Sequence, residues 1–401
     1  MNCATARTLC LPSLGGVQII CADRAQISQA EDAFSKLVQS LDLLSYVHTE
    51  RIRTTEAWVL KCALQQDIRQ SWLPDHDSTK LFETLGHNRQ SSLDRDVDRE
   101  VLVSLLAAPL AFAFSDVASL ASAVRVRRYI VTDSRKTALA FKTQAAERPE
   151  AYWHYDEDRG FILNPGANLI DALVSATQPE ATGKLYDFSC YRASEYVILL
   201  GLARELQQHN PELFDELQTY NQYHAIRSGQ FHDVFLIEYG LEQALPVRYY
   251  VPGDRLWFRN PDAHSSDASG FEGSWVIYMG GGLFSNFWRR DDPFTLESKC
   301  VEVFHWRHGT YTDAEGELRI DEERVTAHCR DTFADPEKTQ SVLQRMIRLR
   351  DPKGVYADGG CIDSTREYPR AATGHGCELS LPQLPEHLRA ITPAIAKSSR
   401  R

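Results

Sequence analysis

The sequence predicts an α+β fold, in which helices pack to one side of an antiparallel sheet. Three observations support this prediction. Residues 23–150 carry mainly helical patterns, a strongly apolar helix begins at Cys190, and strand-like segments dominate residues 231–306. The chain has 401 residues, of which 43% are hydrophobic. That is enough apolar material for a sizeable core in one large domain or two.

The first 115 residues are expected to form a mainly helical region. Residues 28–31 (S-Q-A-E) have the spacing of a capping box, and apolar residues follow at helical intervals: Phe34, Leu37, Val38 and Leu41. Residues 76–99 are polar and charged, which indicates a solvated linker, whereas the apolar residues 101–114 predict a buried helix. The apolar stretch 8–22 is typical either of a poor signal peptide or of a segment that contains a short strand over residues 16–22.

A second region, residues 116–306, is expected to form the core of the protein. A helical pattern covers 116–146, a short aromatic strand opens at Tyr152-Trp153, and residues 168–177 predict another helix. The apolar helix that begins at Cys190 is expected to end near His209. The next helix then starts at Asn210-Pro211, with proline in its preferred first-turn position.

Six strands are predicted after these helices, and Gly280-Gly281-Gly282 provides a tight hairpin connection between two of them. They cover residues 231–239, 247–251, 254–258, 274–279, 283–288 and 299–306. Residues 307–401 are expected to be a C-terminal extension. It has one helix around residues 337–350 and a frayed tail at residues 398–401.

Composition excludes several classes of function. A net charge of −11 and a pI near 5.7 argue against non-specific binding to nucleic acid or to anionic membranes. Residues 101–114 are too short to span a bilayer. The nine cysteines are odd in number and have no regular spacing, which indicates reduced thiols in a cytoplasmic protein. The cysteines and histidines between residues 328 and 377 fit no standard zinc pattern, and no metal or cofactor is expected.

Cys190 is the main candidate for chemistry. A thiol at a helix N-terminus faces unpaired backbone N–H groups and the positive end of the helix dipole, and both stabilise the nucleophilic thiolate. Arg192 would add positive charge, and the apolar helix behind Cys190 would hold it rigidly. The alternative is that Cys190 is one more small residue of the core.

Several motifs in a fixed order decide in favour of a nucleophile. Residues 152–163 read Y-W-H-Y-D-E-D-R-G-F-I-L, and residues 186–190 read Y-D-F-S-C. G-D-R-L-W-F-R-N-P follows at residues 253–261, and F-E-G-S-W-V-I-Y-M-G at residues 271–280. In the order and the sequence of these motifs, the chain resembles the bacterial protein-glutamine gamma-glutamyltransferases of the spore-coat type over about residues 117–290.

The resemblance implies a papain-like α+β core and two-step covalent catalysis without a cofactor. The cysteine attacks a glutamine carboxamide of a protein or peptide, releases ammonia and forms a thioester. A lysine side chain or another small amine then takes the acyl group, and water as the acceptor gives deamidation instead. Asp254, Trp257, Ser274 and Trp275 lie within the shared motifs and are candidates for substrate binding.

The chain departs from the family at the partners of the cysteine. Ser189 stands where the family has a glutamate before its cysteine, and Ser274 where it has a glutamate after the glycine of the downstream strand. Asn286 aligns with the histidine of the family. The nucleophile is therefore kept while the residues expected to activate it are replaced.

Two other residues are candidates to fill this gap. Glu272 is two positions from Ser274, so in an extended strand both side chains point to one face, about 6–7 Å apart. His305 would face inward from the predicted strand 299–306 and could meet the thiolate. Asn286 could orient an imidazole, as the asparagine of papain-like triads does. Each of these residues also has a purely structural explanation.

The sequence therefore predicts a cysteine-dependent acyltransferase of transglutaminase type. A deamidase and a hydrolase with a Cys190–His305 pair are alternatives, and so is an inactive binding module that keeps Cys190 for packing. A cytoplasmic location is expected, and a role as a secreted effector that acts on host proteins is the alternative.

Overall fold

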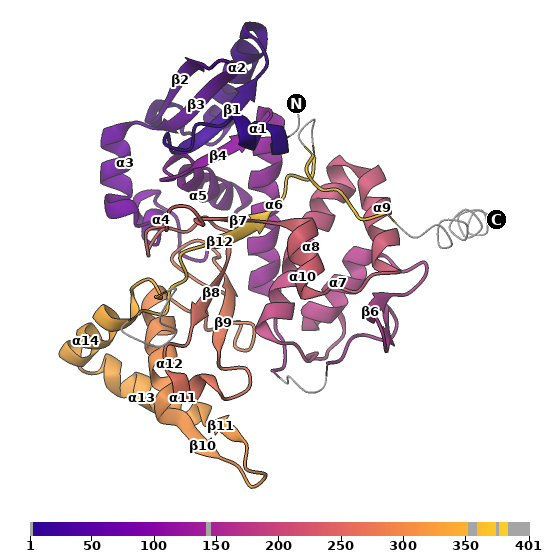
Figure 1. The fold of residues 1–401 in the computed structure, drawn as a ribbon, viewed down its shortest axis with the longest axis vertical. Coiled ribbons are helices and arrows are strands. Elements are labelled where there is room, and N and C mark those ends of the chain that lie inside the picture. Colours follow the sequence, from indigo (N-terminus) through magenta and orange to yellow (C-terminus); the bar gives the residue numbers. More distant parts are fainter. Residues whose placement is uncertain (1–2, 142–145, 352–358, 374–376, 384–401) are drawn as a thin grey trace.

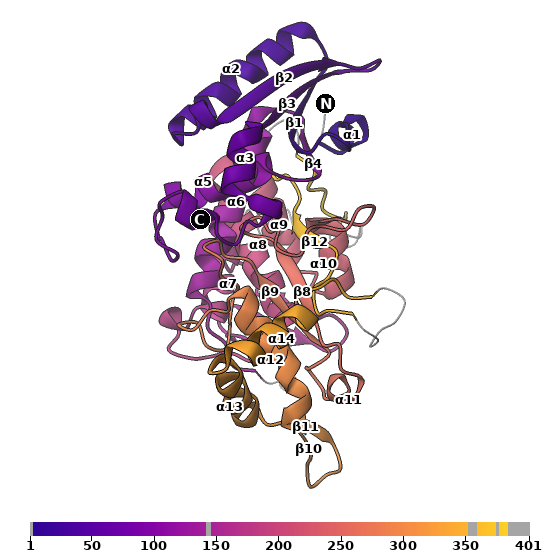
Figure 2. The same cartoon turned by 90° about the vertical axis from the view of Figure 1, so that its left-hand side faces the viewer.

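A computed structural model describes residues 3–141, 146–351, 359–373 and 377–383. Figure 1 shows three levels along the longest axis: an N-terminal sheet with its helices, a central group of long helices, and a C-terminal group of shorter helices. Figure 2 shows the same order from the side. The predicted tail at residues 398–401 and His375 lie outside the described residues.

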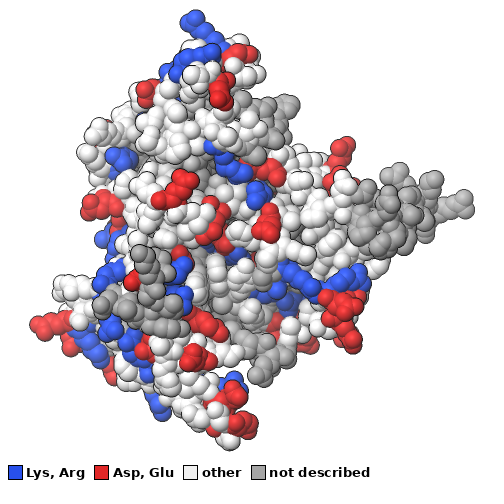
Figure 3. Space-filling view, viewed as in Figure 1, with Lys and Arg blue, Asp and Glu red and all other residues white. Residues whose placement is uncertain are grey.

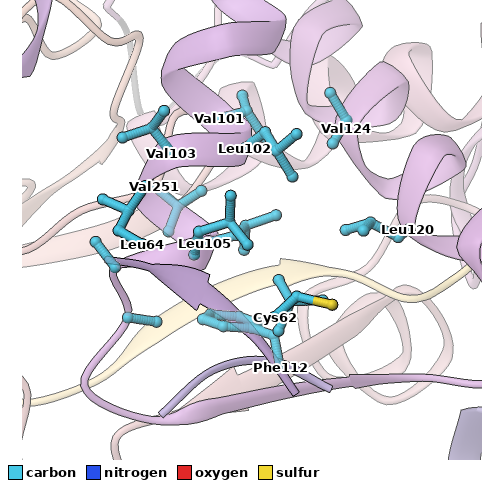
Figure 4. Close-up of a cluster of buried hydrophobic side chains, with 14 of the residues drawn as sticks. Cys62, Leu64, Val101, Leu102, Val103, Leu105, Phe112, Leu120, Val124 and Val251 are labelled. Atoms are coloured by element: carbon cyan, nitrogen blue, oxygen red, sulfur yellow. The ribbon is translucent and has the colours of Figure 1, made fainter. Parts of the chain in front are cut away.

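The N-terminal level is a four-stranded sheet covered by helices on both faces. Its strand order is β2-β3-β1-β4, with β1 antiparallel to β3 and parallel to β4. The strands are β1 (Gly16–Cys21), β2 (Val47–Arg53), β3 (Trp58–Leu64) and β4 (Ala111–Phe114), and the helices are α1 (Cys3–Leu9), α2 (Arg24–Ser40), α3 (Gln66–Trp72), α4 (Leu81–Thr84) and α5 (Asp94–Leu106). One face of β1 packs with α2 and α5 in the core that Figure 4 shows in part, and the other face packs with α1.

The prediction of a mainly helical region missed most of this sheet. β2 alternates polar and half-buried side chains and is exposed over much of its length, so it lacks the apolar pattern of a buried strand. The predicted helix over residues 101–114 is wrong in its second half, because α5 ends at Leu106 and β4 follows Pro109. The capping box at residues 28–31 is also wrong, since α2 begins earlier with Asp23 as its N-cap.

The central level consists of helices, of which the sequence predicted all but α10. Its helices are α6 (Val117–Lys136), α7 (Leu169–Thr177), α8 (Cys190–His209), α9 (Pro211–Asn221) and α10 (Ser228–Phe235), and a hairpin of β5 (Trp153–Asp156) and β6 (Gly160–Leu163) lies beside them. α6 packs closely on α8. A side chain at Gly201 would place its Cβ 2.6 Å from Ile130 Cγ1, so glycine is needed for this approach. α6 ends ten residues before the predicted end at residue 146.

A second sheet lies against the start of α8. It contains β7 (Leu236–Tyr239), β8 (Arg255–Arg259), β9 (Gly273–Ile277) and β12 (Arg366–Pro369) in the antiparallel order β7-β12-β8-β9. The last strand in the chain thus occupies a central position. The predicted boundary at residue 306 divides this sheet, because the C-terminal extension supplies one of its strands.

The largest correction concerns residues 299–306, which form a helix and not a strand. α12 (Leu296–Gly309) begins with a capping box between Thr295 and Ser298, a signal of a helix start that the apolar alternation of the following residues concealed. Residues 231–235 belong to α10, and residues 247–251 and 283–288 form no strand. The remaining elements are α11 (Ala263–Ser266), β10 (Thr310–Thr312), β11 (Leu318–Ile320), α13 (Glu322–Phe333) and α14 (Pro336–Met346).

The triple-glycine turn after β9 binds the buried carboxyl group of Glu100. All three glycines have positive φ angles, a conformation that other residues rarely adopt. The Gly281 N–H donates to Glu100 Oε1 at 2.9 Å, and a Cβ at Gly280 would lie 2.8 Å from Glu100 Oε2. The turn therefore connects the second sheet to α5.

Three findings from the described part of the chain concern the sequence-based exclusions. None of its helices is long and apolar enough to cross a membrane. Eight cysteines of the described residues are free thiols. The described residues also bring together no group of three histidine, cysteine or acidic side chains that could hold a metal ion.

Candidate active site

Cys190 is the first residue of α8, as the sequence predicted. Ser189 has an extended backbone and acts as the N-cap, because its Oγ accepts a hydrogen bond from the Arg192 N–H at 3.3 Å. The family position that carries a glutamate therefore serves here to start the helix. Almost every residue from Ala193 to Leu206 is buried, so the packing of α8 fixes the position of the thiol.

The half-buried Cys190 opens into a small cavity of about 100 Å³, called here the Cys190 cavity. Gly273 and Ser274 of β9 form one side of it, and α12 contributes Lys299 and Glu302. Aromatic residues form much of the remaining wall: Phe141, Phe271, Trp288, Phe294 and Trp306. A cavity of this size is suited to a small planar group such as a carboxamide.

The cavity brings together Cys190 and two of the three positions that the resemblance aligned with partners of the family's cysteine. Cys190, Ser274 and Asn286 all line it. Asn286 holds the following loop in place, because its Nδ2 donates to the Asp292 carbonyl at 2.9 Å and its Oδ1 accepts from the Arg289 N–H. Ser274 and Asn286 thus lie beside Cys190, and neither of them carries a side chain that titrates near neutral pH.

Lys299 and Glu302 were missed by the sequence reasoning. Lys299 Nζ lies 2.6 Å from Glu302 Oε2 and 4.0 Å from the centroid of the Phe294 ring, and the Lys299 side chain is only 4% exposed. Residues three apart share a face only in a helix. The incorrect prediction of a strand placed these two side chains on opposite faces.

The charge state of Cys190 depends on opposing influences. Burial raises the pKa of the Cys190 thiol above its ordinary value, because the thiolate loses hydration. A hydrogen bond from the Trp275 backbone N–H and the positive charge of Lys299 act in the opposite direction and lower this pKa. Lys299 is the charged side chain that most favours the thiolate.

His305 does not meet Cys190, so the predicted Cys190–His305 pair is wrong. The His305 side chain leaves α12 on the side of α13, where its Nε2 lies 2.7 Å from Thr332 Oγ1 and its Nδ1 2.8 Å from His308 Nδ1. Its ring also stacks on His328. Burial and the two neighbouring imidazoles lower the pKa of His305 to about 4, which keeps the ring neutral near pH 7.

Glu272 is also outside the Cys190 cavity. It precedes β9 and is exposed, and its carbonyl oxygen accepts a hydrogen bond from the Asn260 N–H at 3.0 Å. The predicted shared face with Ser274 requires an extended strand, and β9 begins only at Gly273. Among the described residues that line the cavity there is no histidine.

The other predicted substrate-binding residues lie around the site and not in it. Asp254 is fully buried and accepts hydrogen bonds from Arg127 at 2.8 Å and from the Val251 N–H at 2.8 Å. The Trp257 and Trp275 rings stack on each other 5.9 Å apart, and neither residue lines the cavity. Gly273 is necessary below them, because its Cβ would lie 2.1 Å from Trp257 Nε1.

Comparisons with known proteins agree with these observations. A family model described as protein-glutamine gamma-glutamyltransferase matches residues 81–358. The chain therefore belongs to this family, and its function is of transglutaminase type. No curated protein matches the chain. Among solved structures, a transglutaminase from Geobacillus stearothermophilus, without its C-terminal extension, is similar at 21% sequence identity. That similarity covers 52% of this chain and 96% of the other, with a TM-score of 0.37.

Proposed function

We propose that this protein transfers the acyl group of a glutamine side chain through a thioester on Cys190. The observation that carries the proposal is the position of Cys190, which begins α8 and opens into a cavity beside the buried cation of Lys299. Membership of the family supports protein substrates. The chemistry of the cavity supports the reaction at this cysteine.

The first step forms the thioester. Cys190 Sγ attacks the carboxamide carbon, the C–N bond breaks, and the nitrogen leaves as ammonia with the proton that the thiol gives up. The backbone N–H groups of Cys190, Tyr191 and Trp275 interact with the thiolate, so they are the candidates to stabilise the carbonyl oxygen as it gains negative charge. No group is oxidised or reduced, so the step needs no cofactor.

The second step releases the acyl group. A primary amine attacks the thioester carbon, the C–S bond breaks, and one amine proton returns to Cys190 as an isopeptide bond forms. Water in place of the amine gives a glutamate, which is deamidation. The aromatic wall of the cavity limits the entry of water, because Trp288, Phe294 and Trp306 offer it few hydrogen-bonding partners.

Lys299 takes part of the role that an imidazole has in related enzymes. Its positive charge stabilises the thiolate before attack. Glu302 holds the Lys299 ammonium at the cavity by the contact of 2.6 Å between Lys299 Nζ and Glu302 Oε2. This pair is what distinguishes the proposed site from the arrangement that the resemblance implied.

A second candidate function is a binding module without catalysis. Two observations favour it: burial raises the pKa of Cys190, and Ser274 and Asn286 occupy the positions of the family's glutamate and histidine. In that case the Cys190 cavity would bind a glutamine side chain without reacting with it.

Assays of ammonia release and of the incorporation of a labelled primary amine into a glutamine-rich protein separate these candidates. The proposal predicts both signals for the unaltered protein, their loss in Cys190→Ala, and their retention in Cys377→Ala, which removes another half-buried thiol. Ammonia without amine incorporation would show a deamidase. Equal signals from the unaltered protein and Cys190→Ala would contradict catalysis at this residue.

A further inference from the structure

A second cavity lies next to the first and is lined by four arginines. It has a volume of about 230 Å³, and Ser189, Arg192 and Tyr196 of α8 form part of its wall. Arg148, Arg159 and Arg227 come from three other segments, and Asp187 is the one acidic residue of the lining. It is called here the arginine cavity. Its lining carries a formal charge of +3, although the whole chain carries −11.

Arg148 is the most deeply buried arginine of this cavity that has no direct partner of opposite charge. It is 5% exposed, and its guanidinium lies 3.3 Å from the centroid of the Phe188 ring, with Tyr196 and Phe161 also around it. Its Nη1 donates to the carbonyls of Glu147 and Asp187, and its Nε is buried without a hydrogen-bonding partner. In the described part of the chain, Arg148 forms no direct ion pair with a carboxylate, although the Asp187 carboxylate in the same lining attracts it. A buried cation without a directly paired counter-charge is costly.

Two arginines at the edge of the cavity are exposed. Arg159 pairs with Asp156 at 2.6 Å on the turn of the β5–β6 hairpin, and Arg227 donates to the Asp158 carbonyl of the same turn. Figure 3 shows basic side chains, together with acidic ones, over the region of this hairpin and α10. Each guanidinium has more donors than these contacts use. The edge therefore retains capacity to bind an anion.

The arginine cavity and the Cys190 cavity are lined by consecutive residues of the chain. Ser189 lines the arginine cavity and Cys190 lines the Cys190 cavity. Consecutive Cα atoms are about 3.8 Å apart, and an extended peptide advances about 3.3 Å per residue. A side chain within about three positions of a glutamine held at Cys190 can therefore reach the arginines.

We propose that the arginine cavity binds a carboxylate of the protein substrate, from a glutamate or aspartate close in sequence to the reactive glutamine. Arg192 and Arg159 already pair with Glu195 and Asp156, and the remaining N–H groups of the four guanidiniums are donors of the kind that carboxylates accept. The substrate carboxylate also gives Arg148 a counter-charge in direct contact. The volume of the cavity accommodates one acidic side chain. The proposal names a class of substrate and so rests on the proposed function, but binding at the cavity does not require catalysis.

Calorimetric titration of the Cys190→Ala protein tests the proposal without any turnover. Two capped pentapeptides with a central glutamine serve as probes, one with glutamate and one with alanine at the four flanking positions. The acidic peptide is expected to bind about tenfold more tightly, because a charge-assisted hydrogen bond contributes at least about 1.5 kcal/mol. General attraction cannot produce this preference, since the protein is itself acidic.

Variants of the arginines test whether the preference for the acidic peptide arises at the arginine cavity. Arg159→Gln combined with Arg227→Gln changes only exposed side chains and is expected to remove most of the preference. Arg319→Gln is the matched control, because Arg319 also pairs with an aspartate, Asp313 at 2.7 Å, on an exposed hairpin. Equal binding of the two peptides would overturn the proposal, as would an equal loss in the control. Tight binding of a phosphoserine peptide without binding of the glutamate peptide would overturn the assignment to a carboxylate.

This test separates the two proposals from each other. A preference for the acidic peptide in a protein that releases no ammonia would support the arginine cavity and contradict the proposed catalysis. Ammonia release together with equal binding of the two peptides would support the proposed catalysis and contradict the proposal for the arginine cavity.

Discussion

Replacement of Lys299 by methionine tests the proposed replacement for the family's imidazole. Methionine keeps most of the buried apolar stem and removes only the charge. A positive charge close to an acidic group lowers its pKa by about 1–3 units. The Lys299 side chain is 4% exposed and is therefore little screened by solvent, but Glu302 at 2.6 Å cancels part of its charge. The lower end of this range is therefore expected.

Lys299→Met should thus raise the pKa of Cys190 by about one unit. Below the pKa, each unit reduces the thiolate fraction tenfold, so alkylation by iodoacetamide should slow by about tenfold at neutral pH. Glu302→Gln should have the opposite effect, because it removes a negative charge from the same cavity. Lys299→Arg retains the positive charge, so Cys190 in this variant should be alkylated at nearly the rate of the unaltered protein.

The assay is the alkylation rate of each cysteine, followed by peptide mass spectrometry from about pH 6 to pH 10. The other cysteines serve as internal controls, since a variant that loosens the whole protein would speed alkylation at Cys377 as well. A Lys299→Met protein with an unchanged or lower pKa at Cys190 would refute the reasoning. Faster alkylation in this variant would do the same.

Three further predictions concern packing, pH dependence and the histidine. Gly273→Ala would place a Cβ 2.1 Å from an indole nitrogen and should lower the free energy of unfolding, measured by urea denaturation, by about 1–3 kcal/mol. Gly229→Ala is the control, because its Cβ would have nothing within 4 Å, and it should not destabilise the protein. Equal effects of the two variants would contradict the packing described for Gly273. Burial raises the pKa of Glu100 to about 7, so its stabilising effect is complete below about pH 4 and is lost as pH rises through 7. Tm should therefore fall between about pH 5 and 8, less steeply in Glu100→Gln, and an unaltered slope would contradict this assignment. His305→Asn should leave alkylation of Cys190 unchanged, and a tenfold decrease would revive the Cys–His pair.

The parts of the site that the sequence predicted are those with local signals. The helix start at Cys190, the long apolar run after it and the proline at the start of α9 are each readable within a few residues. Ser274 and Asn286 were located through the order of the shared motifs, and the structure places both in the Cys190 cavity. The mixed helix and sheet composition was also predicted, because many of the helices and strands have local signals of this kind.

The parts that the sequence could not predict depend on long-range contacts or on ambiguous patterns. β12 pairs with β7 and β8, which precede it by more than one hundred residues, and no local signal announces such pairing. Residues 299–306 alternate in a way that fits a buried helix as well as a strand. This one ambiguity displaced His305 into the predicted site and hid Lys299 and Glu302. Thr295 as an N-cap, followed by Glu297 in the first turn, is the local signal that favours a helix here.

The most direct test of a thioester on Cys190 is the intact mass of the protein after incubation with a glutamine peptide and rapid quenching in acid. Without an amine acceptor, the account predicts an adduct equal to the peptide less one ammonia, mapped to Cys190 and removed by hydroxylamine. Cys190→Ala should give no adduct under the same conditions. An adduct that maps to another cysteine, or ammonia release from the Cys190→Ala protein, would contradict the central claim.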